Sequence, residues 1–251
     1  MTLITEKGLF TNILGSLTDL TAPAVAARYA PAFGRDEEVE AVCSAVLQNQ
    51  TVVLRGPSGV GKTAIWVEVA RRLHAADPAY VRVYAASVAQ LQNGCIYMGH
   101  WEQKLAELDS EIAAFTARGI HCLLLVTDFG NLFRVSRTSR AEQKVIADDV
   151  LGYVESGHLR VAGELTPDLF RPGLGDDQRW LGRIHLVDVP PLTAGDLLAC
   201  LRRALAWKAQ RAGGVYGGHL PPAWRRGADA PRTAAEEALI RAVLLLSLIH
   251  I

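Results

Sequence analysis

A glycine-rich octapeptide, GPSGVGKT, has residue types and spacing that suit the binding of phosphate groups. Its glycines let backbone N–H groups converge on phosphate oxygens without a Cβ in the way. A helix that begins near Lys62 would add the positive end of its dipole. Lys62 would reach the β- and γ-phosphates of a nucleotide, and the Thr63 hydroxyl would bind Mg²⁺. The predicted phosphate-binding residues are Gly56, Pro57, Ser58, Gly59, Val60, Gly61, Lys62 and Thr63.

The segments on either side of this loop favour a phosphate site over a plain glycine-rich turn. Residues 51–55 (TVVLR) are a β-branched run that predicts a strand. Residues 63–74 place Ile65, Val69 and Leu73 at helical spacing. A strand, a glycine-rich loop and a helix in this order form the arrangement that closes on phosphate.

A second chemical signal is the aspartate that follows an apolar run. Residues 121–127 (HCLLLVT) are typical of a strand that is buried on both faces, and Asp128 comes next. An aspartate after an apolar strand is a common way to start a turn, so Asp128 alone predicts little. Together with the phosphate loop, it predicts a carboxylate that holds Mg²⁺ through water.

Strand-like and helical patterns alternate along most of the chain. Strands are predicted at 51–55, 80–84, 121–127, 159–162 and 184–189, and helices at 37–48, 63–74, 102–118, 141–156, 193–210 and 233–247. This alternation predicts an α/β fold of the P-loop NTPase type, with a parallel five-stranded sheet flanked by helices and a small all-helical piece after it. The expected organisation is a lead-in (1–33), a nucleotide-binding domain (34–190) and a helical lid (191–246).

Composition excludes several other classes of protein. The 251 residues are 50% hydrophobic and 21% charged, which excludes intrinsic disorder, and the formal net charge is zero. A neutral chain argues against nucleic acid and anionic membranes as partners. The four cysteines form no C-x-x-C pair, which argues against zinc and disulfide frameworks. With no signal peptide and no apolar stretch of spanning length, the expected location is the cytoplasm.

Several further motifs resemble those of the AAA+ ATPases, and in particular the first ATPase module of the Clp-type unfoldases and disaggregases. The resemblance covers roughly residues 16–246. It rests on the phosphate loop and on these stretches: FGRDEEV (33–39), GCIYMGHWE (94–102), SGHLRVAG (156–163), DQRWLGRI (177–184) and VPPLT (189–193).

The resemblance implies roles for three residues and a set of ligands. Tyr97 matches the pore-loop aromatic that grips an extended polypeptide, although a tyrosine between glycines is also an ordinary turn residue. Thr166 is the best match to the residue that senses the γ-phosphate. Arg183 matches one of two arginines that complete a neighbour's site, with a solvated arginine as the alternative. The ligands are ATP and Mg²⁺. The partners are other copies in a hexameric ring, an unfolded or aggregated polypeptide, and a protease or an adaptor.

Phe129 departs from the family pattern, in which a glutamate that aims the attacking water follows the magnesium aspartate. A phenyl ring can neither accept a proton nor orient water. We consider two outcomes: Glu164 compensates from the neighbouring strand as the base, or the chain is a pseudo-ATPase in which Phe129→Glu would raise the rate. Glu164 as an ordinary loop carboxylate stays open. A third class, an AAA+ switch on nucleic acid, is disfavoured by the neutral charge.

The C-terminal residues 247–251 (SLIHI) match one reading frame of a common sequencing adapter. We therefore expect a fragment that is cut inside the lid, so that the lid is incomplete and the last five residues are an artefact. The alternative is a native apolar helix that packs on the lid.

Overall fold

The computed structural model describes residues 12–78, 81–96, 99–134, 146–171 and 173–211. Its strands are β1 (Thr18–Asp19), β2 (Thr51–Arg55), β3 (Val81–Ala86), β4 (His121–Val126), β5 (Arg160–Leu165) and β6 (Ile184–Asp188). The longer helices are α3 (Asp36–Leu47), α4 (Lys62–Ala76), α6 (His100–Thr116), α7 (Ile146–Glu155) and α10 (Ala194–Arg211). The shorter ones are α1 (Ile13–Ser16), α2 (Pro23–Ala26), α5 (Val88–Leu91), η1 (Phe129–Phe133), α8 (Pro167–Phe170), η2 (Leu174–Asp176) and α9 (Gln178–Leu181).

The strands form one sheet in the order β1-β3-β4-β5-β2-β6. The five strands from β2 to β6 are parallel to one another, which confirms the predicted parallel sheet. A sixth strand, β1, pairs antiparallel with β3 at the edge and lies in the part of the chain that was expected to be a lead-in. It has only two residues, too few for an alternation of apolar and polar side chains to predict it from the sequence.

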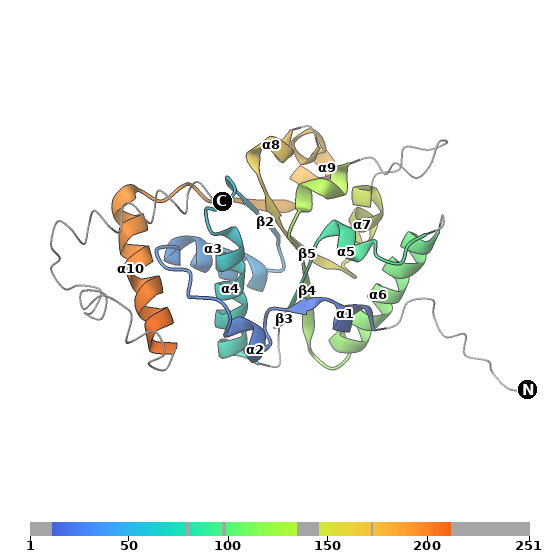
Figure 1. The fold of residues 1–251 in the computed structure, drawn as a ribbon. Coiled ribbons are helices and arrows are strands. Elements are labelled where there is room, and N and C mark those ends of the chain that lie inside the picture. Colours follow the sequence, from blue (N-terminus) through green and yellow to red (C-terminus); the bar gives the residue numbers. More distant parts are fainter. Residues whose placement is uncertain (1–11, 79–80, 97–98, 135–145, 172, 212–251) are drawn as a thin grey trace, which may run out of the picture.

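Helices cover both faces of the sheet and make a three-layered α/β/α domain (Figure 1). On one face α3 and α4 bury Val42, Val46, Ile65 and Trp66 against the sheet. On the other face α1, α6 and α7 form a second apolar cluster with the opposite side of the same strands. Burial on both faces explains why β4 reads as a continuous apolar run rather than as an alternating one.

An aromatic cluster closes the second apolar face near the carboxyl end of β4. The Phe129 and Trp180 rings meet edge to face with their centroids 5.4 Å apart, and Phe133 lies 6.0 Å from Phe129. Phe129 and Trp180 are fully buried. The Phe129 ring also occupies the space that a Cβ at Gly163 would need. Phe129 is therefore a core residue of this domain.

The structure differs from the sequence-based expectation at the ends of several elements. β5 begins one residue later than predicted and continues for three residues beyond Ala162, so that Glu164 lies inside a strand. The four-residue helices α5, α8 and α9 were not predicted, because one turn carries no readable period. Residues 141–145 of one predicted helix and the whole of the predicted helix 233–247 lie outside the described residues, as does the pentapeptide 247–251.

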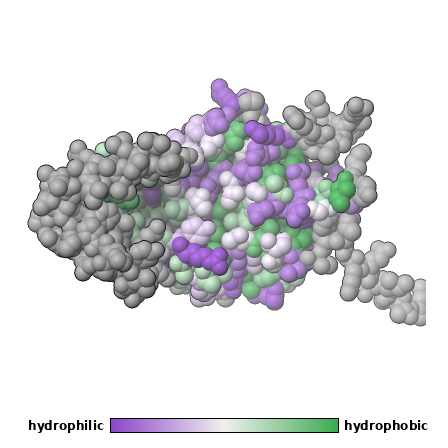
Figure 2. Space-filling view, in the orientation of Figure 1, coloured by the Kyte–Doolittle hydropathy of each residue, from purple (hydrophilic) through white to green (hydrophobic). Residues whose placement is uncertain are grey.

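The last described helix, α10, contacts the segment that leads into α3. The Cys200 thiol donates a hydrogen bond to the Phe33 carbonyl, with sulfur and oxygen 3.1 Å apart. Over the described part of the face in Figure 2, hydrophilic and hydrophobic residues are interspersed. Among the described helices, none has the length and apolar character needed to cross a membrane.

Candidate functional site

The predicted phosphate loop connects the carboxyl end of β2 to the amino end of α4. Gly59 and Gly61 have φ angles of 80° and 97°, in the region that glycine adopts without a steric penalty. A Cβ at Gly56 would overlap the carbonyl oxygen of Val189. Two different demands, positive φ and close approach of backbones, thus account for the glycines of the motif.

Lys62 is the first residue of α4, and only 8% of its surface is exposed. Its Nζ donates hydrogen bonds to the carbonyl oxygens of Gly56 and Pro57, each at 2.8 Å. Burial lowers the pKa of Lys62, and the nearby Glu164 carboxylate opposes that effect. The ammonium group is therefore held directly over the loop that would receive the phosphates.

Thr63 and Glu164, which are 101 positions apart in the sequence, lie side by side in the fold. The Thr63 Oγ1 donates to Glu164 Oε2 at 3.0 Å. Glu164 lies on β5, where its Cα partner on β2 is Leu54, and the next residue of β5 accepts a hydrogen bond from the Gly56 N–H. The Glu164 side chain is thus fixed beside the phosphate loop by the register between two adjacent strands.

Glu164 is 93% buried, and burial raises its pKa to about 7. The Thr63 hydroxyl and the Lys62 charge work against this rise. A carboxyl group with such a pKa exchanges protons near neutrality, which suits either proton transfer or the binding of a cation.

We expect this raised pKa to make the metal-free protein less stable as pH rises. The unfolded chain releases the Glu164 proton near pH 4.5 and the folded chain near pH 7, so the free energy of unfolding falls across that window. The loss is about 3 kcal/mol. Urea unfolding at pH 5 and pH 8 should show that Glu164→Gln abolishes this fall, whereas Glu37→Gln, at an exposed position of α3, keeps it.

The predicted magnesium aspartate, Asp128, takes a different set of partners. Its Oδ1 accepts from the Val88 N–H at 2.7 Å, and its Oδ2 accepts from the Asn131 amide at 2.8 Å. These bonds join Asp128 to α5 and η1, whereas the recorded partner of Thr63 is Glu164. The role of Asp128 at a metal stays a prediction.

Thr166, the predicted γ-phosphate sensor, follows β5 directly and is the N-cap residue of α8. A hydrogen bond with the Thr166 side chain lowers the pKa of Asp168 in the first turn of that helix. The Leu165 carbonyl, one residue before, accepts the Gly56 N–H at 3.1 Å. Thr166 therefore lies at the same edge of the sheet as the phosphate loop, where a sensor has to be.

Arg183 lies at the amino ends of the parallel strands, because it directly precedes β6. The phosphate loop lies at their carboxyl ends, because it follows β2. Its guanidinium contacts Glu155 at 2.9 Å and donates to the Arg179 carbonyl at 3.0 Å. The side chain is 44% exposed. This placement suits action on another copy of the chain rather than on the loop of its own domain.

Tyr97, the predicted pore-loop aromatic, lies outside the described residues, between α5 and α6. Its described neighbours are Ile96, which is 77% exposed, and Gly99, which has a φ of 88°. The loop thus presents an apolar side chain to solvent next to the tyrosine.

Sequence reasoning missed the contribution of Arg35. Its side chain is buried, with Nη2 donating to the carbonyl oxygens of Val60 at 2.9 Å and Pro190 at 2.8 Å, and Nη1 paired with Glu38 at 2.7 Å. The arginine therefore connects the phosphate loop to the segment before α10. The FGRDEEV motif contained the signal, because an arginine beside apolar helix positions needs acceptors when buried.

Replacing Arg35 by Met should loosen the phosphate loop while it preserves most of the apolar stem. Hydrogen bonds of a charged donor contribute roughly 1.5–3 kcal/mol each, so we expect about 2–4 kcal/mol lower unfolding free energy and weaker nucleotide binding. The matched control is Arg28→Met, at an exposed position just after α2. Urea unfolding and equilibrium nucleotide binding should both show a larger loss for Arg35→Met than for Arg28→Met. Equal losses would contradict the proposed role of the Arg35 hydrogen bonds to Val60 and Pro190.

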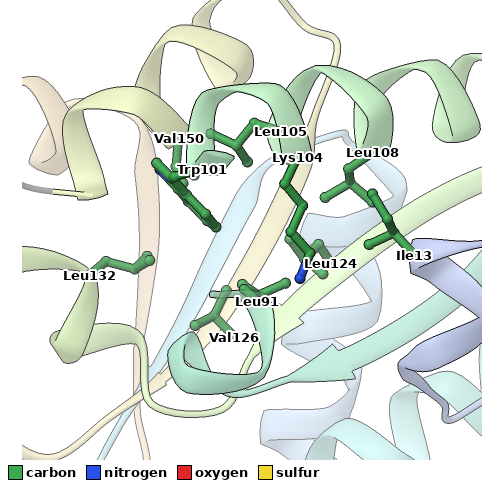
Figure 3. Close-up of a pocket in the computed structure, with 10 residues that line it drawn as sticks. All are labelled: Ile13, Leu91, Trp101, Lys104, Leu105, Leu108, Leu124, Val126, Leu132 and Val150. Carbon is green, nitrogen blue, oxygen red and sulfur yellow. The ribbon is translucent and has the colours of Figure 1, made fainter. Parts of the chain in front are cut away.

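An apolar cavity of about 10 Å³ lies between α6 and the sheet (Figure 3). It is lined by Leu91, Trp101, Leu132 and other apolar side chains, and Lys104 reaches across its wall to donate to the Asn93 carbonyl at 2.7 Å. This space is about that of one water molecule, so it is not a ligand site.

Comparisons with known proteins agree with this geometry. No family model matches the chain. The chain is 30% identical over 193 residues to the chaperone protein ClpB of Tropheryma whipplei strain TW08/27 and to that of Streptomyces albus G; these alignments cover 74% of this chain but 26% and 22% of those relatives. It therefore spans about a quarter of the length of the curated relatives that it matches.

Among solved structures, the fold is similar to that of an S. cerevisiae Hsp104–ADP complex, with a TM-score of 0.66 and 21% identity over 80% of this chain and 28% of that chain. An S. cerevisiae Hsp104 complex with casein gives a TM-score of 0.65 at 22% identity, with 80% of this chain and 34% of that chain covered. The ClpB alignments show that the chain is homologous, over about three quarters of its length, to the ClpB family of AAA+ chaperones, and the Hsp104 structures share its fold.

Proposed function

We propose that this chain is the ATP-binding AAA+ module of a Clp-type protein unfoldase or disaggregase, which couples ATP binding and hydrolysis to polypeptide translocation. The module would comprise the α/β domain (34–190) and a helical lid (191–246). The observation that carries the proposal is the cluster of Lys62, Thr63 and Glu164 at the carboxyl edge of a parallel sheet. Parallel α/β sheets bind ligands at this edge.

The chain's own residues support nucleotide binding in three ways. The loop residues from Ser58 to Gly61 supply backbone N–H groups at the amino end of α4, where the helix dipole favours anions. The Lys62 ammonium lies over the loop and provides positive charge. The Thr63 hydroxyl is an oxygen ligand of the kind that Mg²⁺ prefers, and a bound Mg²⁺ would neutralise charge on the phosphates.

Assembly and substrate form the second part of the proposal. The position of Arg183, exposed at the edge opposite to the phosphate loop, suits a ring in which it reaches a neighbour's nucleotide. One related Hsp104 structure is a complex with casein, which favours a polypeptide substrate. The proposed ring is hexameric and cytoplasmic, and a protease or an adaptor remains a candidate partner.

The direct test is to measure particle size and ATPase rate together. Light scattering of the purified chain should show larger particles with ATP and Mg²⁺ than without nucleotide. A chain that binds no ATP would refute the proposal. A chain that binds ATP but stays monomeric would refute the ring.

We predict that Tyr97→Ala abolishes crosslinking to an extended polypeptide but leaves nucleotide affinity and particle size unchanged. The reason is that the loop between α5 and α6 exposes Ile96, so its neighbour should face a substrate rather than the core. The matched control is Tyr29→Ala, which removes a partly exposed tyrosine elsewhere. If Tyr97→Ala lowers the melting temperature and ATP binding instead, the tyrosine is a core residue.

The second candidate function is a pseudo-ATPase that serves as a ring scaffold or regulator. Phe129 favours it, because this fully buried ring cannot act on a water molecule. Tight ATP binding with negligible turnover in the assembled parent protein would identify this case.

A further inference from the structure

One oxygen of the buried Glu164 carboxylate has no hydrogen-bond partner in the described part of the chain. Glu164 Oε2 accepts the Thr63 hydroxyl, but Oε1 makes no hydrogen bond with any residue that the structure describes and is itself inaccessible to solvent. Leaving a buried carboxylate oxygen unsatisfied costs free energy, and such atoms are rare in folded proteins. An unpartnered oxygen beside a phosphate loop therefore calls for a ligand.

We propose that Glu164, from β5, supplies the carboxylate that holds a divalent cation at Thr63, in place of a carboxylate from β4. The inference rests on the proposed nucleotide binding and deepens it, because it assigns the metal-holding charge to a specific strand. Mg²⁺ is the cation of choice, since carboxylate and hydroxyl oxygens are the hard ligands that it prefers.

The distance between the two oxygens fits this assignment. Adjacent ligands on an octahedral Mg²⁺ with bonds of about 2.0–2.1 Å are separated by about 2.9 Å. The Thr63 Oγ1 and the Glu164 Oε2 are 3.0 Å apart. Because the hydroxyl donates its proton to Oε2, its lone pairs remain available to a cation, and Oε1 remains available for the cation or for water bound to it.

The pleat of the sheet explains why the carboxylate comes from β5. Along β4, Leu123 and Leu125 face α3 and α4, whereas Leu124 and Val126 face the other cluster. The Thr127 N–H continues the ladder to Ala86, so the same alternation directs Thr127 to the α4 face. The residue directly after β4 that faces α4 thus carries a neutral hydroxyl.

The neighbouring strand supplies the charge at the same level of the sheet. Val126, the last residue of β4, pairs with Gly163, so Thr127 just after β4 is level with Glu164 on β5. Asp128, one residue further along, accepts hydrogen bonds from Val88 and Asn131 with its two carboxylate oxygens. Among these strand ends, Glu164 is the carboxylate that contacts the phosphate-loop threonine.

The test measures Mn²⁺ binding to the ADP-loaded protein by electron paramagnetic resonance, with Mg²⁺ as competitor. Glu164→Gln should weaken Mn²⁺ affinity roughly 10- to 100-fold, the usual cost of losing a group that holds a metal. Its ADP affinity in EDTA should not fall, since no cation is then present and the variant removes a negative charge beside the phosphate loop. Asp128→Asn should keep the parent's Mn²⁺ affinity. Glu164→Asp, with a shorter charged side chain, should retain part of it and serves if the glutamine variant does not fold.

The possible outcomes separate this inference from the proposed function. If Asp128→Asn weakens Mn²⁺ binding and Glu164→Gln does not, the metal assignment is wrong although nucleotide binding stands. The same conclusion follows if Glu164→Gln lowers only the hydrolysis rate, which is the signature of a base. If the parent binds no ADP with or without Mg²⁺, the proposed function fails and the metal inference fails with it.

Discussion

Replacing Phe129 by Glu is expected to unfold the α/β domain rather than to install a general base. Phe129 is fully buried against Trp180 and Phe133. Removing a buried phenylalanine costs about 3–5 kcal/mol through lost contacts and the cavity. A carboxylate in the same place adds the penalty of burying a charge or of keeping it protonated. Since whole domains are stable by only about 5–15 kcal/mol, the variant should be largely unfolded.

Circular dichroism and urea unfolding measure this directly. Phe129→Leu is the control, because it keeps an apolar side chain at the same place and should remain folded. The pseudo-ATPase hypothesis, taken from the sequence alone, instead expects Phe129→Glu to be folded and faster in ATP hydrolysis. A folded Phe129→Glu protein with raised turnover would show that the side chain can leave the aromatic cluster and reach the nucleotide.

Lys62→Ala should weaken ATP binding by roughly 2–4 kcal/mol, because it removes a charged donor that the structure holds over the phosphate loop. This loss corresponds to roughly a 30- to 700-fold higher dissociation constant. Isothermal titration with ATP and Mg²⁺ provides the measurement.

A second buried lysine provides a matched control for the Lys62 variant. Lys104 is as buried as Lys62, but its ammonium donates to the Asn93 carbonyl next to the apolar cavity. Lys104→Met should therefore change thermal stability and leave ATP affinity at the parent value. Parent-like ATP binding by Lys62→Ala would mean that the glycine-rich loop is not a phosphate site.

The part of the fold that could be predicted is the part that local sequence encodes. The strand at Thr51–Arg55 was predicted with its observed bounds, because a β-branched run ends at a glycine there. The helix after the loop differs from its prediction by one residue at the start and two at the end. The apolar run that forms β4 reads directly as a doubly buried strand.

The parts that could not be predicted depend on strand register and on the pleat. Asp128 was the natural magnesium candidate because it follows an apolar strand, yet a shift of one residue decides which face a side chain reaches. The Thr63–Glu164 contact joins residues 101 positions apart. It depends on the register between β2 and β5, which pairs Leu54 with Glu164. Arg35 is similar, since it contacts a carbonyl 155 residues away. The pairing of these residues with distant partners leaves no period in the sequence, although the FGRDEEV motif marks Arg35 itself.

The Arg35 hydrogen bonds couple two parts of the domain in free energy. One guanidinium donates to the carbonyl oxygens of Val60, in the phosphate loop, and Pro190, ahead of α10. A ligand that moves Val60 would therefore also change the free energy of the backbone arrangement at Pro190. Thermodynamic linkage is reciprocal, so a second ligand that favours one arrangement at Pro190 would change the loop's affinity for the first ligand by the same factor as the first changes the affinity for the second.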